Sequence, residues 1–268
     1  MGSSTISLGL GLGGGKSATS SGTSGGTPFT NQYSVSFDGS DDNLNLGTPF
    51  QSTFASAFSI SLWYKQDSAT GTRALFGSRK GGDDAVIAYI SANTVYMWYE
   101  SNNRRSLGGF AQTSDTNWHH FCVTVQQNAT SVNAKLYLDG VYRKLNAHGC
   151  VMADYTNTAN LFIGARNYVS SAPDSYFSGL IDEAAIFGSA LSDGGVSIGE
   201  DAGGDIGDIY NDGVPNDLGT DGLNLSPLGW WRMGDINGAS GVIIADQGNG
   251  GNNGTLTNGP TYSTTVPT

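Results

Sequence analysis

Glutamate is nearly absent from this chain, and charged residues make up only 13% of its 268 residues. Its glutamates are Glu100, Glu183 and Glu200, which lie far apart in the sequence. Retaining glycosidases need two carboxyl groups about 5 Å apart, which closely spaced acids along one strand can provide. The pattern E-x-D-x-E, which would place acids in this way, does not occur in the chain. Asp182 and Glu183 are adjacent, so on a strand their side chains are expected to point to opposite faces. We therefore expect a chain that is not an enzyme.

Basic residues are also few. Lys and Arg number 12 against 23 Asp and Glu, which gives a net charge of −11. An acidic chain is repelled by phosphate backbones, so nucleic acid is not an expected partner. No apolar run approaches the roughly 20 residues of a membrane span, and the N-terminus lacks the basic and apolar regions of a signal peptide. The cysteines, Cys122 and Cys150, are expected to be two separate buried thiols.

What the chain does have is glycine, at 40 residues, and apolar side chains at every second position. Residues 58–65 (FSISLWYK), 94–100 (TVYMWYE) and 118–125 (WHHFCVTV) show this alternation, which is typical of strands that bury one face. Asp139-Gly140 is typical of a tight hairpin turn. No helical period of useful length appears before residue 190. The pattern predicts an all-β, antiparallel sandwich or jelly roll.

Composition divides the chain into four segments. Residues 1–28 are rich in Gly, Ser and Thr and are expected to form an extended N-terminal arm. Residues 29–200 form the predicted jelly roll, and residues 201–227 form an acidic, glycine-rich connection with a short helical turn near 205–213. Residues 228–268 return to a strand-like pattern and are expected to complete or extend the sandwich.

Several strings resemble a known family. VSFDGSDDNLNLG (35–47), FSISLWYK (58–65), WHHFCVTV (118–125), KLYLDGVYRK (135–144), NLFIGAR (160–166) and GLIDEAAIFGSALS (179–192) resemble successive strands of laminin-G-like, concanavalin A-like jelly rolls, in the same order. The resemblance covers residues 33–192. It implies two packed antiparallel sheets and often a structural calcium ion. Members bind glycans, proteins or steroids, or act as spacers, so the fold alone leaves the function open.

The whole chain also resembles structural proteins of tailed bacteriophages, through its Gly/Ser-rich start, its single jelly roll and its residues 230–258. Our leading hypothesis is a non-enzymatic component of the virion exterior, in the head, tail or fibre. The arm would bind other virion subunits, so the chain is expected to be oligomeric or bound in an assembly. The alternative is a carbohydrate-binding adhesin on a virion or cell surface, with host-surface glycans as ligands.

Aromatic side chains provide the candidate glycan site. Tyr96, Trp98 and Tyr137 occupy strand positions opposite the clearest apolar rows. Exposed aromatic rings can stack against sugar rings. Aromatic residues also pack beneath covering loops, and we expect this for Trp63.

Asp182 is the candidate for a metal site. It shares its strand parity with Leu180, Ala184 and Ile186, and a carboxylate on an apolar face needs a partner. A calcium ion could neutralise it, with further oxygen ligands from Asp38, Asp41, Asp246 and Asn249. In the other interpretation, Asp182 accepts hydrogen bonds from backbone or Trp N–H groups without a metal.

Overall fold

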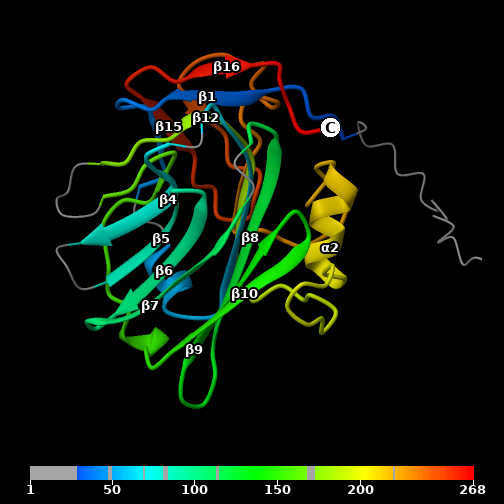
Figure 1. The fold of residues 1–268 in the computed structure, drawn as a ribbon. Coiled ribbons are helices and arrows are strands. Elements are labelled where there is room, and N and C mark those ends of the chain that lie inside the picture. The colour runs from blue at the N-terminus through cyan, green and yellow to red at the C-terminus, as the bar shows by residue number, and fades with distance from the viewer. Residues whose placement is uncertain are drawn as a thin grey trace, which may run out of the picture.

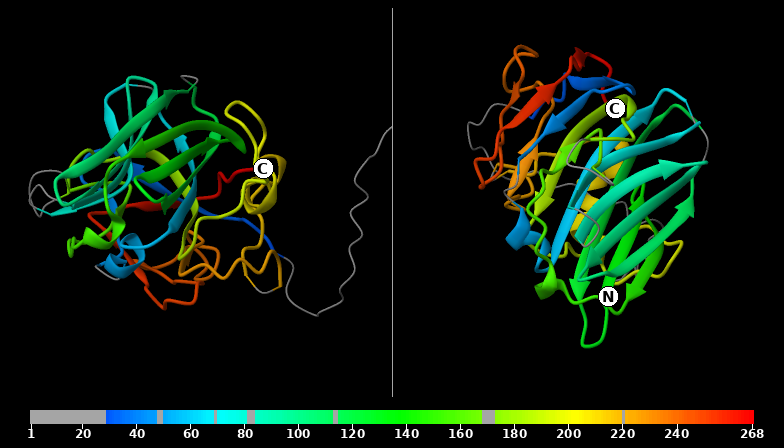
Figure 2. Two further views of the ribbon diagram at one scale, coloured as in Figure 1. Left: turned by 90° about the horizontal axis from the view of Figure 1, so that it is seen from below. Right: turned by 90° about the vertical axis from the view of Figure 1, so that its left-hand side faces the viewer.

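The computed structural model describes residues 29–47, 50–68, 70–80, 84–112, 115–167, 173–219 and 221–268. Two antiparallel sheets pack face to face, as Figures 1 and 2 show. The prediction of an all-β jelly-roll sandwich is thus confirmed. The predicted arm, residues 1–28, lies outside the described residues.

Sheet A has the order β10 (Val141–His148), β9 (Val132–Leu138), β8 (Trp118–Gln127), β3 (Phe58–Gln66), β12 (Ser178–Phe187), β1 (Ser34–Asp38) and β16 (Thr261–Ser263), and β13 (Gly229–Trp231) also pairs with β12. Sheet B has the order β14 (Ile243–Ile244), β15 (Gly254–Thr257), β2 (Asn43–Asn45), β11 (Phe162–Ile163), β4 (Thr72–Lys80), β5 (Asp84–Ser91), β6 (Thr94–Ser101) and β7 (Arg104–Ala111). The cyan and green strands β4–β7 face the viewer in the right-hand panel of Figure 2.

Helical structure within these ranges is short. It consists of α1 (Gln51–Phe54), α2 (Gly204–Tyr210) and two 3₁₀ turns, Met152–Asp154 and Asn211–Gly213. The helical turn expected near 205–213 is therefore present. No helix among the described residues is long and apolar enough to span a membrane.

The main core lies between the two sheets and follows the alternation of the sequence. Every second residue of β3, from Phe58 to Tyr64, is buried in it, as are alternate residues of β6 and β8. The hairpin turn between β9 and β10 has positive φ angles at Asp139 (51°) and Gly140 (72°), as expected for its Asp-Gly pair. Cys122 and Cys150 are free, buried thiols, as predicted.

A β-bulge in β12 overturns the expected parity of Asp182. Asp182 pairs with Trp63 of β3 and Ala185 pairs with Ser61, so two residues of β12 face only one of β3. Glu183 takes φ = 44° at this point. The extra residue moves Ala184 and Ile186 into the core between the sheets, whereas Asp182 stays on the outer face of sheet A.

The outer face of sheet A is covered by the chain that follows β12. A second apolar cluster there includes Tyr137, Phe187, Ile206, Ile209 and Trp230. Trp63 stacks on Tyr210 of α2 with ring centres 5.9 Å apart. Figure 1 shows α2 on the side of β8–β10 away from sheet B. Trp63 therefore packs beneath a covering segment, as the sequence predicted.

The C-terminal segment adds strands to both sheets. β13 pairs with β12 and β16 pairs with β1 in sheet A, and β15 pairs with β2 in sheet B. Trp231, Met233, Ile244 and Leu256 contribute to the main core. The segment is thus packed into the same hydrophobic core as the strands before it.

Candidate functional site

Large side chains occupy the outward positions of β5 and β6. Because alternate residues of β6 fill the core, Tyr96 and Trp98 face away from it. Tyr89 of β5 lies opposite Tyr96 in the register. The two tyrosine rings stack with centres 5.0 Å apart and planes inclined by 15°, and both are half-buried. Their partly exposed rings give this face an apolar surface.

Three arginines lie over the aromatic rings of this face. The Arg79 guanidinium is 4.6 Å from the centre of the Trp98 ring, and that of Arg105 is 5.5 Å from it. The Arg166 guanidinium is 4.9 Å from the centre of the Tyr89 ring. A guanidinium over an aromatic ring is stabilised by the electrostatics of the ring. We call the set the arginine–tyrosine face, and it comprises Arg79, Tyr89, Tyr96, Trp98, Arg105 and Arg166.

Glycine at position 109 lets the Tyr96 ring lie against β7. Gly109 pairs with Tyr96, and a Cβ atom there would come within 2.8 Å of Tyr96 Cδ1. The same Cβ atom would come within 2.5 Å of the Val95 carbonyl oxygen, so a larger residue would disturb both the strand backbone and the Tyr96 ring. The chemistry of the face is thus an apolar ring surface beside guanidinium donors, which suits a ligand with both C–H faces and oxygen acceptors.

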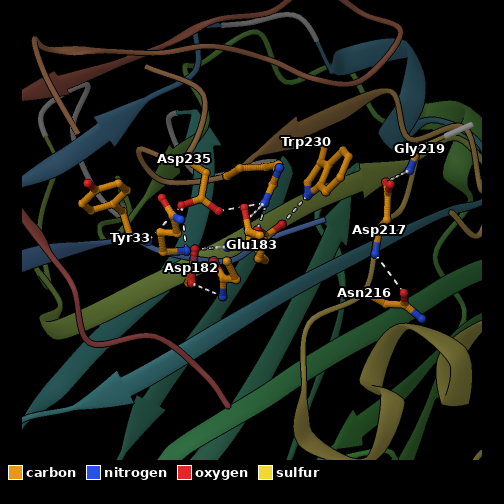
Figure 3. A network of polar contacts seen from close by, with 12 residues as sticks. Tyr33, Asp182, Glu183, Asn216, Asp217, Gly219, Trp230 and Asp235 are labelled. Atoms are coloured by element: carbon orange, nitrogen blue, oxygen red, sulfur yellow. Dashed lines mark hydrogen bonds and ion pairs between the residues drawn. The ribbon is translucent and has the colours of Figure 1, made fainter. Parts of the chain in front are cut away.

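A network of buried carboxylates lies at the bulge of β12 (Figure 3). Asp182 Oδ2 accepts a hydrogen bond from Asn31 Nδ2 (2.9 Å), and Oδ1 accepts one from the Glu183 backbone N–H (2.8 Å). Glu183 Oε2 accepts from Trp230 Nε1 (2.6 Å), and Oε1 accepts from Arg232 Nε (3.1 Å). The bulge thus places both carboxylates on one side of the sheet, which corrects the expectation that they point to opposite faces.

The network also ties the start of the described chain to the C-terminal segment. Arg232 Nη2 donates to Asp235 Oδ2 (2.7 Å) and to the Thr30 carbonyl (2.6 Å). Asp235 Oδ1 in turn accepts from the backbone N–H groups of Gln32 and Tyr33. Every carboxyl oxygen of Asp182 and Glu183 therefore accepts a hydrogen bond from the chain itself. We interpret the network as a clasp that holds residues 30–33 against residues 230–235.

Burial changes the acidity of this network. It raises the pKa of Glu183 to about 7, although the Arg232 charge and the Trp230 hydrogen bond act in the opposite direction. The pKa of Asp182 is also raised, first by burial and then by the neighbouring Glu183 charge. The folded protein therefore holds a proton on Glu183 more tightly than the unfolded chain does. The stability from this group is complete below the unfolded pKa of 4.5 and is lost as the pH rises through about 7.

Replacement of Glu183 by glutamine is expected to flatten the pH dependence of stability. Between pH 5 and pH 8 the melting temperature of the Glu183→Gln variant should fall less than that of the unmodified protein, because the titrating group has been removed. Thermal unfolding at several pH values measures this difference. Glu200→Gln, at an exposed glutamate, is the control and should keep the original slope. Equal slopes in the two variants would contradict the role of Glu183.

The residues expected to bind calcium have different hydrogen-bond partners. Asp182 is fully buried (0% exposed) in the clasp. Asp246 accepts hydrogen bonds from the backbone N–H groups of Trp230, Gly248 and Asn252 and organises its own loop. Asn249 belongs to that loop, and its backbone N–H donates to the Pro227 carbonyl. Protein N–H groups thus bond to the carboxylates of Asp182 and Asp246, and a calcium site built from Asp182, Asp246, Asn249, Asp38 and Asp41 stays a prediction.

Asp38, Asp41 and Asp42 remain as a group that could hold a cation. One carboxylate oxygen from each lies within 4.8 Å of the others, and carboxylate oxygens are the ligands that calcium prefers. Hydrogen bonding from the Ser40 backbone lowers the pKa of Asp38, whereas burial raises that of Asp42. The donor set of this turn fits calcium, and calcium binding itself stays a prediction.

The sequence matches a known family over most of the sandwich. Residues 38–197 match the family described as the concanavalin A-like lectin/glucanases superfamily. The chain belongs to this superfamily. No curated protein matches its sequence.

Solved structures superpose on most or on part of this chain. A protein from Bacteroides ovatus, described as a candidate carbohydrate binding protein, superposes with a TM-score of 0.64 at 16% identity, over 90% of this chain. The chain spans 62% of the length of that protein. The CBM40 module of a Ruminococcus gnavus sialidase bound to α2,3-sialyllactose superposes with a TM-score of 0.47 at 13% identity. The match covers 59% of this chain and 93% of the module. Domains LG4-5 of the mouse laminin α1 chain superpose with a TM-score of 0.45 at 17% identity. The match covers 65% of this chain and 45% of the laminin chain.

Within this concanavalin A-like sandwich, the three aromatic residues expected to bind glycan do not form one platform. Tyr137 is in sheet A and is fully buried (0% exposed) beneath the segment that covers that sheet. Trp98 is in sheet B but is only 3% exposed. Only Tyr96 is half-exposed. The expectation was wrong for Tyr137, because strand parity cannot show which outer face of the sandwich is covered. Trp98 lies beneath the surface of the arginine–tyrosine face and supports it.

The arginines of this face were missed in the sequence. A signal was present, because the strands β4–β7 contain five basic residues (Arg73, Arg79, Lys80, Arg104 and Arg105) and two acidic ones (Asp84 and Glu100), in a chain that is acidic overall. This local excess of positive charge was visible in the sequence. Its position over the aromatic rings depends on the pairing of the strands.

Proposed function

We propose that this chain binds carbohydrate through the arginine–tyrosine face. The observation that carries the proposal is the stacked, half-exposed pair of Tyr89 and Tyr96 on the outer face of sheet B. Such rings accept the C–H faces of sugars, and the neighbouring guanidinium groups donate hydrogen bonds to sugar oxygens. Membership of a superfamily named for lectins and glucanases, and the fold shared with the Bacteroides ovatus protein, support this class of ligand.

Replacement of Tyr96 by alanine tests this proposal. The Tyr96→Ala variant is expected to lose roughly tenfold or more in glycan affinity, because an apolar ring surface is removed from the site. Tyr96→Phe is the matched control and should keep most of the affinity, since it keeps the ring. Binding to a glycan array, followed by calorimetry on the glycans that bind, measures both. A folded Tyr96→Ala variant with unchanged affinity, or unmodified protein that binds no glycan, would reject the proposal.

The place of this domain in a larger assembly stays a prediction. The hypothesis of a bacteriophage virion component, oligomeric and anchored through its arm, depends on residues 1–28, which lie outside the described residues. Carbohydrate binding is compatible with it, because an adhesin on a virion exterior would use the same face. The absence of enzymatic activity likewise stays a prediction.

A further inference from the structure

The arginine–tyrosine face carries three guanidinium groups on a protein that is acidic overall. Both acidic residues of β4–β7, Asp84 and Glu100, have polar partners within the protein. Asp84 is buried and accepts hydrogen bonds from the backbone N–H groups of Asn102 and Thr156. Glu100 is buried, with its Oε2 3.8 Å from Arg79 Nη2. Glu100 therefore offsets part of the Arg79 charge, and Arg105 contributes an exposed positive charge to the face.

Arg105 is the arginine best placed to meet a ligand. It is exposed, and its guanidinium lies over the buried ring of Trp98. Across the described part of the chain, no hydrogen bond or ion pair to its guanidinium is formed. A guanidinium has five N–H donors in a planar fork that matches an anionic group with two oxygens. Arg105 therefore offers a bidentate anion site on a rigid aromatic base.

Arg166 places a second positive charge beside the tyrosine pair. Its guanidinium lies over Tyr89, and its Nε is 3.2 Å from Asp174 Oδ1. The Asp174 side chain is 41% exposed, so solvent weakens this pair. Arg166 thus places a guanidinium beside the tyrosine pair, with a charge that Asp174 partly offsets.

The Arg105 guanidinium lies along β6 from the Tyr96 ring. It lies over Trp98, and Trp98 is two residues along β6 from Tyr96. At about 3.3 Å per residue, this separation is about 7 Å. A ligand that stacks one sugar ring on Tyr96 can therefore reach Arg105 with a group on a neighbouring sugar unit.

We infer that the ligand of this face is an anionic oligosaccharide, with one sugar ring stacked on Tyr96 and a carboxylate or sulfate group of another sugar bound by Arg105. The inference rests on the proposed carbohydrate binding and adds the class of sugar. Charge complementarity favours it, because the net charge of −11 repels anions elsewhere on the molecule and leaves the exposed guanidinium of Arg105 as the place of approach.

Paired glycans test this inference. The probes are 3′-sialyllactose against lactose for the carboxylate, and chondroitin sulfate against unsulfated chondroitin oligosaccharides for the sulfate. The unmodified protein is expected to bind one anionic series at least tenfold more tightly than its less charged counterpart, with an affinity that falls as salt is added. The series that binds identifies the anionic group.

Arg105→Gln is the decisive variant. It is expected to lose about tenfold in affinity for the anionic glycan and clearly less for the less charged counterpart, because the charge-assisted bonds to the anionic group are removed only in the first case. Arg143→Gln carries the same charge change at an exposed site on β10 of sheet A and should change neither affinity. Equal binding of the paired glycans, or equal behaviour of the two variants, would overturn the inference while leaving carbohydrate binding intact. No binding to any glycan would overturn both.

Discussion

The Arg232→Met variant is expected to lose about 3–5 kcal/mol of unfolding free energy at pH 8, because two buried carboxylates lose their partner. Arg232 pairs with Glu183 (3.1 Å) and Asp235 (2.7 Å), whose side chains are almost inaccessible to solvent. It also donates to the Thr30 carbonyl. Methionine has a similar length but no charge, so it leaves Glu183 and Asp235 uncompensated. Urea unfolding of the two proteins measures the loss.

Two controls separate the lost charge from lost packing. The loss should become smaller toward pH 5, because Glu183 has a pKa raised to about 7 and can take up a proton instead of remaining charged. The double variant Glu183→Gln/Arg232→Met should recover part of the stability, since one buried charge is then removed as well. A loss below 1 kcal/mol at pH 8 would show that the clasp does not stabilise the fold.

Trp231→Ala is expected to cost about 3–5 kcal/mol, the usual range for a large aromatic removed from a core. The Trp231 side chain is fully buried (0% exposed), packs edge-on against Phe50 with ring centres 5.9 Å apart, and donates from Nε1 to the Asn252 carbonyl (2.9 Å). Trp231 lies beyond residue 197, where the family match ends. A loss of this size in urea unfolding would show that the C-terminal segment unfolds together with the sandwich.

Ile243→Ala is the control for this prediction. Ile243 belongs to the same C-terminal segment, on strand β14, but its side chain is 46% exposed. Its replacement should change the unfolding free energy by no more than about 0.5 kcal/mol. A separate, earlier unfolding transition in Trp231→Ala, with the remainder unchanged, would instead show that the segment is an independent unit.

The candidate site was only partly predictable. The outward direction of Tyr96 followed from the alternation in β6, because that strand is regular over its whole length. Tyr137 obeys the same alternation, but its ring lies under residues that come more than 60 positions later, such as Ile206 and Ile209. Which outer face is open depends on where the connecting segments pack, and local sequence does not contain this information.

The sequence by itself determined the two-layer β fold, since alternating side chains can bury only one face of a strand and the turns carry their own conformational preferences. Asp182 marks the limit of this reasoning, because a single extra residue at Glu183 changed the face of every residue that followed. Only the tertiary structure decided which carboxylates meet Arg232 and which arginines lie over Tyr89 and Trp98. These contacts join residues far apart in the chain, so they depend on strand pairing and register, which alternation alone leaves open.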